Sequence, residues 1–144
     1  MPYELMYSSF CPKPMGVKDL SILLREAREN NQDTGITGVL AYHSNTFIQL
    51  LEGEQDSVYG LYAKIAEDPR HTVIRTIWEA DIDKISFPDW AMGFCHSGNY
   101  NQQQLDIIGM ECNDYIESLK GKKNSTNAFT LFGREFNSQV QQLG

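Results

Sequence analysis

The chain has 144 residues, of which 41% are hydrophobic and 22% charged, as is typical of a soluble globular protein. Its formal net charge of −7 argues against nonspecific binding to nucleic acid and against docking on an anionic membrane surface. The sequence has no apolar run of about 18 residues and no basic-then-apolar start, so we expect no membrane span, no signal peptide and a cytoplasmic location. Three cysteines without CxxC spacing and three scattered histidines favour reduced thiols and no metal site.

The first two thirds of the chain alternate between strand and helix patterns. Residues 3–9 are predicted as a strand, and a helix begins at Val17 and ends at the pair Asn30 and Asn31, because Asn tolerates the left-handed conformation of a helix cap. The elements predicted after it are a hairpin of strands at residues 36–42 and 46–52, a helix stopped by residues 68–70, and strands at 71–79 and 90–95.

This order, β-α-β-β-α-β-β, predicts an α+β, ferredoxin-like sheet with two helices on one face and a groove between them. We assign residues 1–97 to this domain and residues 98–144 to a C-terminal helical extension for output or oligomerisation. The extension contains a helical stripe at residues 101–119, a polar linker at 120–126 and an aromatic stripe of Phe129, Phe132 and Phe136. These stripes are expected to cover the open face of the sheet or to pack on a partner subunit.

Gln49 interrupts an otherwise apolar strand. Period-two alternation places it on one face with Phe47 and Leu51, where an unpaired amide would cost about 1–3 kcal/mol. A carboxamide both donates and accepts hydrogen bonds and can turn end for end. Gln49 therefore needs a polar partner, which could be backbone, water, another side chain or a ligand. Strands one and three are expected to pair in this topology, which would bring the Tyr7 phenol into hydrogen-bond contact with the amide, although an ordinary core tyrosine remains the alternative.

Four segments together resemble the BLUF family, blue-light sensors that use flavin. They are the first strand with Tyr7, residues 29–38 with the asparagine pair, residues 47–53 with Gln49, and residues 87–93. Their order and spacing match the family over roughly residues 2–97. The resemblance implies a noncovalently bound flavin between the two helices, usually FAD, with FMN or riboflavin as alternatives.

The resemblance also implies roles for individual residues. Leu23 and Ile65 correspond to residues that pack on the two faces of the flavin ring, unless they are plain core residues. Asn31 corresponds to an asparagine that bonds the polar edge of the ring near C4=O, and Asn30 lies beside it; either could instead cap the helix. The resemblance assigns four residues to the region that reaches the ribityl and phosphate part of the flavin: Lys64, Asp68, Arg70 and His71. The alternative is that these residues form only a solvated helix end.

The implied mechanism is photochemical rather than catalytic. Excited flavin takes an electron from Tyr7, a proton moves by way of Gln49, and the charges recombine. Gln49 is left rotated or tautomerised with a stronger bond to flavin C4=O, which shifts the spectrum slightly to the red. Trp90 and Met92 correspond to residues that transmit the change, although Trp90 could also be a fixed core residue.

The chain resembles the short, stand-alone type of this family, so we expect no enzymatic activity and an output through a downstream protein partner or a homo-oligomer. Two alternatives have different consequences. A small ferredoxin-like hydrolase would need a phosphate-binding loop, but residues 8–13 lack both arginine and glycine. A flavin-binding module without photochemistry would be yellow but unresponsive to light.

Overall fold

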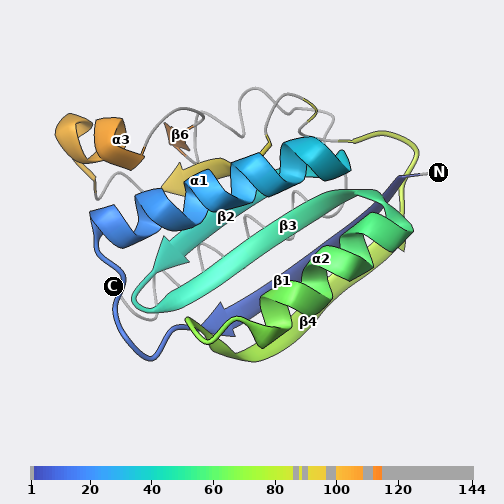
Figure 1. Cartoon of the computed structure of the whole chain (residues 1–144), viewed down its shortest axis with the longest axis horizontal. Coiled ribbons are helices and arrows are strands. Elements are labelled where there is room, and N and C mark those ends of the chain that lie inside the picture. The colour runs from blue at the N-terminus through green and yellow to red at the C-terminus, as the bar shows by residue number, and fades with distance from the viewer. Residues whose placement is uncertain (1, 86–87, 89–90, 97–99, 109–111, 115–144) are drawn as a thin grey trace.

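The computed structural model describes residues 2–85, 88, 91–96, 100–108 and 112–114, and in this part of the chain six strands form one sheet. The sheet order is β4-β1-β3-β2-β5-β6 (Figure 1). The elements along the chain are β1 (Pro2–Phe10), α1 (Val17–Thr34), β2 (Thr37–His43), β3 (Thr46–Glu54), α2 (Gln55–Glu67), β4 (Thr72–Asp81), β5 (Gly93–His96), α3 (Gln102–Ile108) and β6 (Cys112–Asp114).

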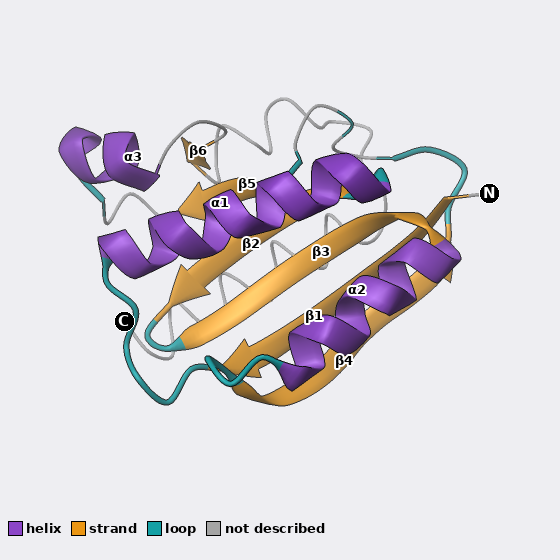
Figure 2. Ribbon diagram, in the orientation of Figure 1, coloured by secondary structure: helices purple, strands orange, loops and turns teal. Residues whose placement is uncertain are grey.

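The central strands have the pairing expected of a ferredoxin-like fold. β1 lies between β3 and β4 and is antiparallel to both, while β2 and β3 form an antiparallel hairpin. β5 adds to the other edge of β2 in parallel orientation. The helices α1 and α2 lie side by side on one face of the sheet, as Figure 2 shows. The predicted fold class is therefore confirmed.

Alternation along β1 separates two buried faces. Leu5 and Tyr7 face the helices and belong to a cluster with Leu20 and Leu24 of α1 and Val58 of α2. Met6, which lies between Leu5 and Tyr7, points to the opposite face of the sheet. Buried side chains on this face come from all three central strands: Met6, Val39, Ala41, Ile48 and Leu50. The aromatic stripe at residues 129–136 and the end of the first stripe at residues 115–119 lie outside the described residues, so for them the expectation that they cover this face stays a prediction.

The first helix is longer than predicted. It continues through Asn30 and Asn31 to Thr34 and ends at Gly35, which has φ 71° and supplies the left-handed cap. The prediction that the asparagine pair ends the helix is wrong, because Gly reaches positive φ at no steric cost and takes that position four residues later. The asparagines therefore lie on the last turns of α1 with their side chains available for other contacts.

The region after β4 differs from the predicted elements. β5 begins at Gly93 rather than at Trp90, and Trp90 itself lies outside the described residues. The predicted helix at residues 101–119 is seen only as α3, Gln102–Ile108, and Cys112 lies in a strand instead. The physical reason is the free edge of β5, which offers main-chain hydrogen bonds that β6 takes up in parallel pairing. The α3 helix packs beside α1, not on the opposite face of the sheet.

The hairpin that carries Gln49 is fixed by its turn and by one close backbone approach. Ser44 and Asn45 have φ 47° and 68°, the positive values that a two-residue hairpin turn requires. Gly38 of β2 lies so close to β3 that an added Cβ would be 2.0 Å from the carbonyl oxygen of Leu50.

No helix in the described part of the chain is long and apolar enough to cross a membrane.

Candidate functional site

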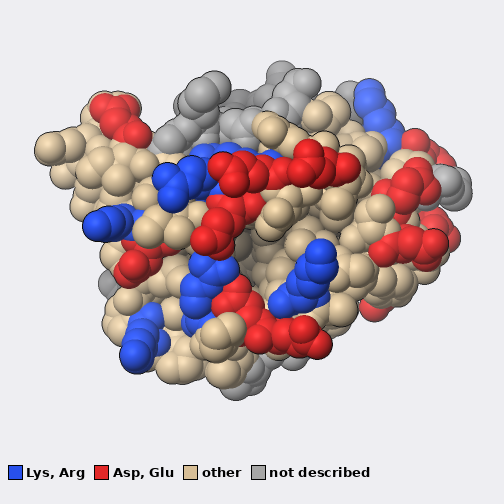
Figure 3. Space-filling view, viewed as in Figure 1, with Lys and Arg blue, Asp and Glu red and all other residues tan. Residues whose placement is uncertain are grey.

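A groove opens between α1 and α2, and its floor is formed by the central strands. It has a volume of about 810 Å³ including its open mouth. Figure 3 shows the hollow near the middle of this face, with acidic and basic side chains gathered around it. Apolar side chains from both helices line its walls, namely Leu23, Ala27, Leu61 and Ile65, which are all half-buried. Such a narrow, mostly apolar groove suits a flat ring.

Gln49 and Tyr7 meet on the floor of this groove. They are direct partners across the antiparallel pair of β1 and β3, so the predicted juxtaposition is confirmed. The Tyr7 hydroxyl donates a hydrogen bond to Gln49 Oε1. On its other side, Gln49 Nε2 donates to the Met92 sulfur at 3.3 Å. Both side chains are nearly inaccessible to solvent, with Tyr7 2% and Gln49 6% exposed.

The surroundings of Gln49 favour one orientation of its amide. Burial is the main cause that raises the pKa of Tyr7 far above its usual range, so Tyr7 is a neutral phenol and a hydrogen-bond donor. A thioether sulfur can accept a hydrogen bond but cannot donate one. An amide turned end for end would place its oxygen against the Met92 sulfur and lose that contact. Met92 therefore stabilises the orientation in which Oε1 faces Tyr7.

His71 packs directly beside Tyr7. Its ring lies edge-on to the Tyr7 ring with centroids 6.3 Å apart. Its Nε2 donates to the carbonyl oxygen of Ile65 at 2.6 Å, which leaves Nδ1 to accept from the Ser9 hydroxyl at 2.8 Å. Both ring nitrogens thus have partners within the protein. The imidazole lines the groove and fixes the end of α2 against β1.

Asn31 has one half of its amide bonded and the other half without a partner. Its Nδ2 donates to the carbonyl oxygen of Ala91 at 2.7 Å. Its Oδ1 is buried and has no hydrogen-bond partner among the described residues, although Asn31 is only 1% exposed and lines the groove. A buried carbonyl left unpaired costs about 1–3 kcal/mol. A ring with an N–H on its edge would donate a hydrogen bond to Asn31 Oδ1, and the pyrimidine part of a flavin has such a group. The residues that line the groove therefore fit a flavin.

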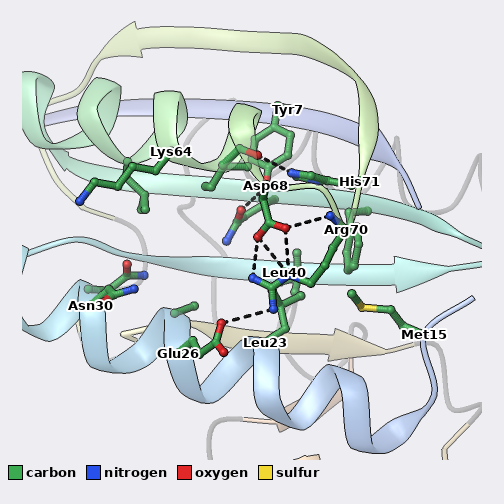
Figure 4. A pocket seen from close by; sticks show the side chains of 16 residues that line it. Tyr7, Met15, Leu23, Glu26, Asn30, Leu40, Lys64, Asp68, Arg70 and His71 are labelled. Carbon is green, nitrogen blue, oxygen red and sulfur yellow. Dashed lines mark hydrogen bonds and ion pairs between the residues drawn. The ribbon is translucent and has the colours of Figure 1, made fainter. Parts of the chain in front are cut away.

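Charged groups bridge the mouth of the groove. Arg70 Nε lies 3.0 Å from both carboxylate oxygens of Asp68, and Arg70 Nη1 reaches Glu26 on α1 at 3.3 Å. The hydrogen bonds from Arg70 are the main cause that lowers the pKa of Asp68. Figure 4 shows this cluster at one end of the groove, while Lys64 extends toward the other end, where Asn30 lies.

The structure brings the residues predicted to bind the cofactor into one place. The groove is lined by all ten of them: Tyr7, Leu23, Asn30, Asn31, Gln49, Lys64, Ile65, Asp68, Arg70 and His71. Met92 contacts Gln49, and its role in transmitting the change stays a prediction. The remaining lining residues were not predicted from the sequence: Met15, Glu26, Ala27, Leu40, Phe47 and Leu61. Alternation along β3 could have assigned Phe47, which shares a face with Gln49, whereas nothing local marks Glu26.

Comparisons with known proteins agree with this geometry. A family model described as sensors of blue light using FAD, BLUF, matches residues 3–93. The photoactivated adenylate cyclase subunit beta of Euglena longa is 40% identical over 89 residues, 61% of this chain but 10% of that protein. The chain thus spans about a tenth of the length of the photoactivated cyclases that it matches.

Two solved structures resemble the whole domain. The photo-activated state of BlsA has a TM-score of 0.63 and 34% identity, covering 75% of this chain and 91% of that chain. The dark state of BlrB, a BLUF protein, has a TM-score of 0.64 and 26% identity, covering 90% of this chain and 89% of that chain. Both support a small sensor domain with this fold.

Proposed function

The chain belongs to the BLUF family of blue-light sensors, and from this premise we propose that it detects blue light with a flavin bound between α1 and α2. The single observation that carries the proposal is the Gln49 amide on the groove floor, held between the Tyr7 hydroxyl and the Met92 sulfur. The family match favours this reading over a small hydrolase with the same fold. The cofactor is FAD or FMN; the family description names FAD, and BlrP1 of Klebsiella pneumoniae, a structural relative, contains FMN.

The groove supports a specific set of binding contacts. In our proposal Leu23 of α1 and Ile65 of α2 pack on the two faces of the ring, and Asn31 Oδ1 accepts from its polar edge. Asn30 and Lys64 lie at one end of the groove, and Asp68 and Arg70 lie at its mouth near His71. Arg70 and Lys64 lie toward opposite ends of the groove, so only one of these two cations would meet a given phosphate of the cofactor.

The light reaction uses the hydrogen bonds around Gln49. When bound, the flavin supplies absorption of blue light and an electron acceptor in its excited state. Tyr7 gives up an electron, and its hydroxyl proton moves along the existing hydrogen bond to Gln49 Oε1. Return of the electron and proton to Tyr7 leaves no net oxidation, and Gln49 is left turned or tautomerised. Burial keeps Tyr7 protonated beforehand, so that the proton is available for the transfer.

The new state can form because the two arrangements of the amide are close in free energy, and it persists for a time because a barrier separates them. In one arrangement Nε2 donates to the Met92 sulfur at 3.3 Å. In the other arrangement this contact would be lost and the amide would bond the flavin C4=O more strongly when the flavin is bound. Bonds of this kind contribute about 1 kcal/mol each, which is enough to shift a balanced equilibrium several-fold. Return to the first arrangement needs no reactant and occurs thermally in the dark.

The output that we propose is a change in binding to a protein partner or to a second copy of the chain. BLUF sensors signal to downstream partners, and a relative from Escherichia coli, 34% identical over 67 residues, is a blue light- and temperature-regulated antirepressor. The photoactivated cyclases are far longer than the segment that this chain matches. We propose that the matched domain acts as a light sensor rather than as a catalyst.

An absorption spectrum of the purified, flavin-loaded protein before and after blue illumination tests the proposal. We expect a small red shift of the flavin bands that reverses in the dark. Protein that cannot be loaded with flavin would contradict the binding site. Loaded protein whose bands do not move under illumination would contradict the light reaction.

A further inference from the structure

Arg28 of α1 holds together two segments that are distant in the sequence. Its Nε donates to the carbonyl oxygen of Met92 at 2.9 Å, and its Nη1 donates to the carbonyl oxygen of Ile108 at 3.3 Å. Asn31, one turn later on the same side of the helix, donates to the carbonyl oxygen of Ala91. The last turns of α1 thus bind two consecutive carbonyl groups directly before β5, and one of these bonds continues to α3.

Met92 connects this cluster to the site. Its sulfur accepts the hydrogen bond from Gln49 Nε2, and its own carbonyl accepts from Arg28. The side chain is completely buried, so it cannot change position without moving its neighbours or its main chain. One residue therefore joins the amide that turns under illumination to the guanidinium group of α1.

Ile108 connects the same cluster to the C-terminal part of the chain. It is the last residue of α3, and carbonyl groups at a helix C-terminus have no partner within the helix. A cation that donates to such a carbonyl also interacts favourably with the helix dipole. The planar guanidinium group presents several N–H groups in fixed directions, so that one arginine can serve two carbonyls at once.

We propose that Arg28 is a positioning residue that couples the Gln49–Met92 contact to α3, so that light-driven turning of Gln49 changes how α3 is held. The inference rests on the proposed function, since it needs Gln49 to turn. Loss of the bond to the Met92 sulfur frees that side chain to shift, its carbonyl moves, and Arg28 transfers the movement to the end of α3. A second contact between β5 and the approach to α3, the ring pair of Phe94 and Tyr100 with centroids 5.5 Å apart, is the competing route.

The test compares hydrogen exchange of α3 in darkness and under blue light for the flavin-loaded full chain, with the absorption shift recorded on the same samples. The variants are Arg28→Ala, Arg28→Lys and the control Arg25→Ala, which removes an exposed arginine of the same helix. In the wild type and in Arg25→Ala we expect exchange of α3 to differ between darkness and light. In Arg28→Ala we expect the red shift to remain, α3 to exchange roughly tenfold faster in the dark, and the light-dependent difference to vanish.

Each other outcome has a definite meaning. A wild-type chain without a red shift would contradict the proposed function, whereas a red shift without any change at α3 would contradict this inference alone. A light-dependent difference in Arg28→Ala equal to that of the wild type would overturn the role of Arg28 and favour the ring pair. If Arg28→Ala does not fold, Arg28→Lys decides. A lysine cannot hold both carbonyls in the same geometry, so an undiminished light-dependent difference in that variant would also refute the coupling.

Discussion

The hydroxyl of Tyr7 is the group whose removal tests the photochemistry most selectively. Tyr7→Phe keeps the buried ring and its contacts with Tyr62 and His71, at centroid distances of 5.4 and 6.3 Å, and removes only the donor to Gln49 Oε1. The amide oxygen is then left unpaired in a site that is 6% exposed, so we expect the free energy of unfolding to fall by about 1–3 kcal/mol. Flavin binding should persist, because Tyr7 contributes only one part of the groove floor.

Two measurements on this variant separate stability from photochemistry. Denaturant titration gives the free energy of unfolding, and absorption spectra before and after blue illumination give the light response, which we expect to be absent. The matched control is Tyr62→Phe, whose hydroxyl lies 2.8 Å from the exposed Thr76 hydroxyl; it should keep the red shift and change stability by less than about 0.5 kcal/mol. A normal, reversible red shift in Tyr7→Phe would refute Tyr7 as the electron donor.

Three further changes test other parts of the account. Gln49→Leu should bind flavin but show no red shift, and a wild-type light-state spectrum in this variant would remove Gln49 from the mechanism. Gly38→Ala should lower the free energy of unfolding by about 3 kcal/mol in a denaturant titration, because the added Cβ would lie 2.0 Å from a main-chain carbonyl oxygen. The control is Gly60→Ala on α2, where an added Cβ has no neighbouring atom within 4 Å. This variant should be neutral or stabilising in the same titration. The pKa of Asp68 is lowered in the folded state by Arg70, so its contribution to stability is present above about pH 4 and is lost as the pH falls through the lowered pKa. Asp68→Asn should therefore flatten the acid limb of a stability–pH profile, and an unchanged acid limb would mean that the ion pair adds nothing.

The sequence was sufficient to predict the centre of the site because the relevant contacts follow from strand geometry. Alternation assigned the face of Gln49, and the element order placed β1 beside β3, which brings Tyr7 opposite Gln49 in the observed register. The hairpin turn was also predictable, because Ser44 and Asn45 stand between two apolar strands. These features depend on neighbours in sequence or on one common topology.

Other features depend on long-range partners and could not be read locally. The asparagine pair looked like a helix end, but Gly35 offered a better cap four residues later. Cys112 fitted a helical stripe, but the open edge of β5 paired with it as a strand. Arg28 looked like an ordinary charged residue of a surface helix, and its role follows only from two carbonyl groups brought near it by the fold.

A light-minus-dark infrared difference spectrum of the flavin-loaded chain is the most direct test of the claim that light rearranges the hydrogen bonds of Gln49. We predict that the flavin C4=O stretch moves to lower frequency under blue light in the wild type, because its hydrogen bond strengthens when the amide turns away from Met92. The same band should stay in place in Gln49→Leu. A carbonyl band that does not move in the wild type, or that moves equally without Gln49, would contradict the account.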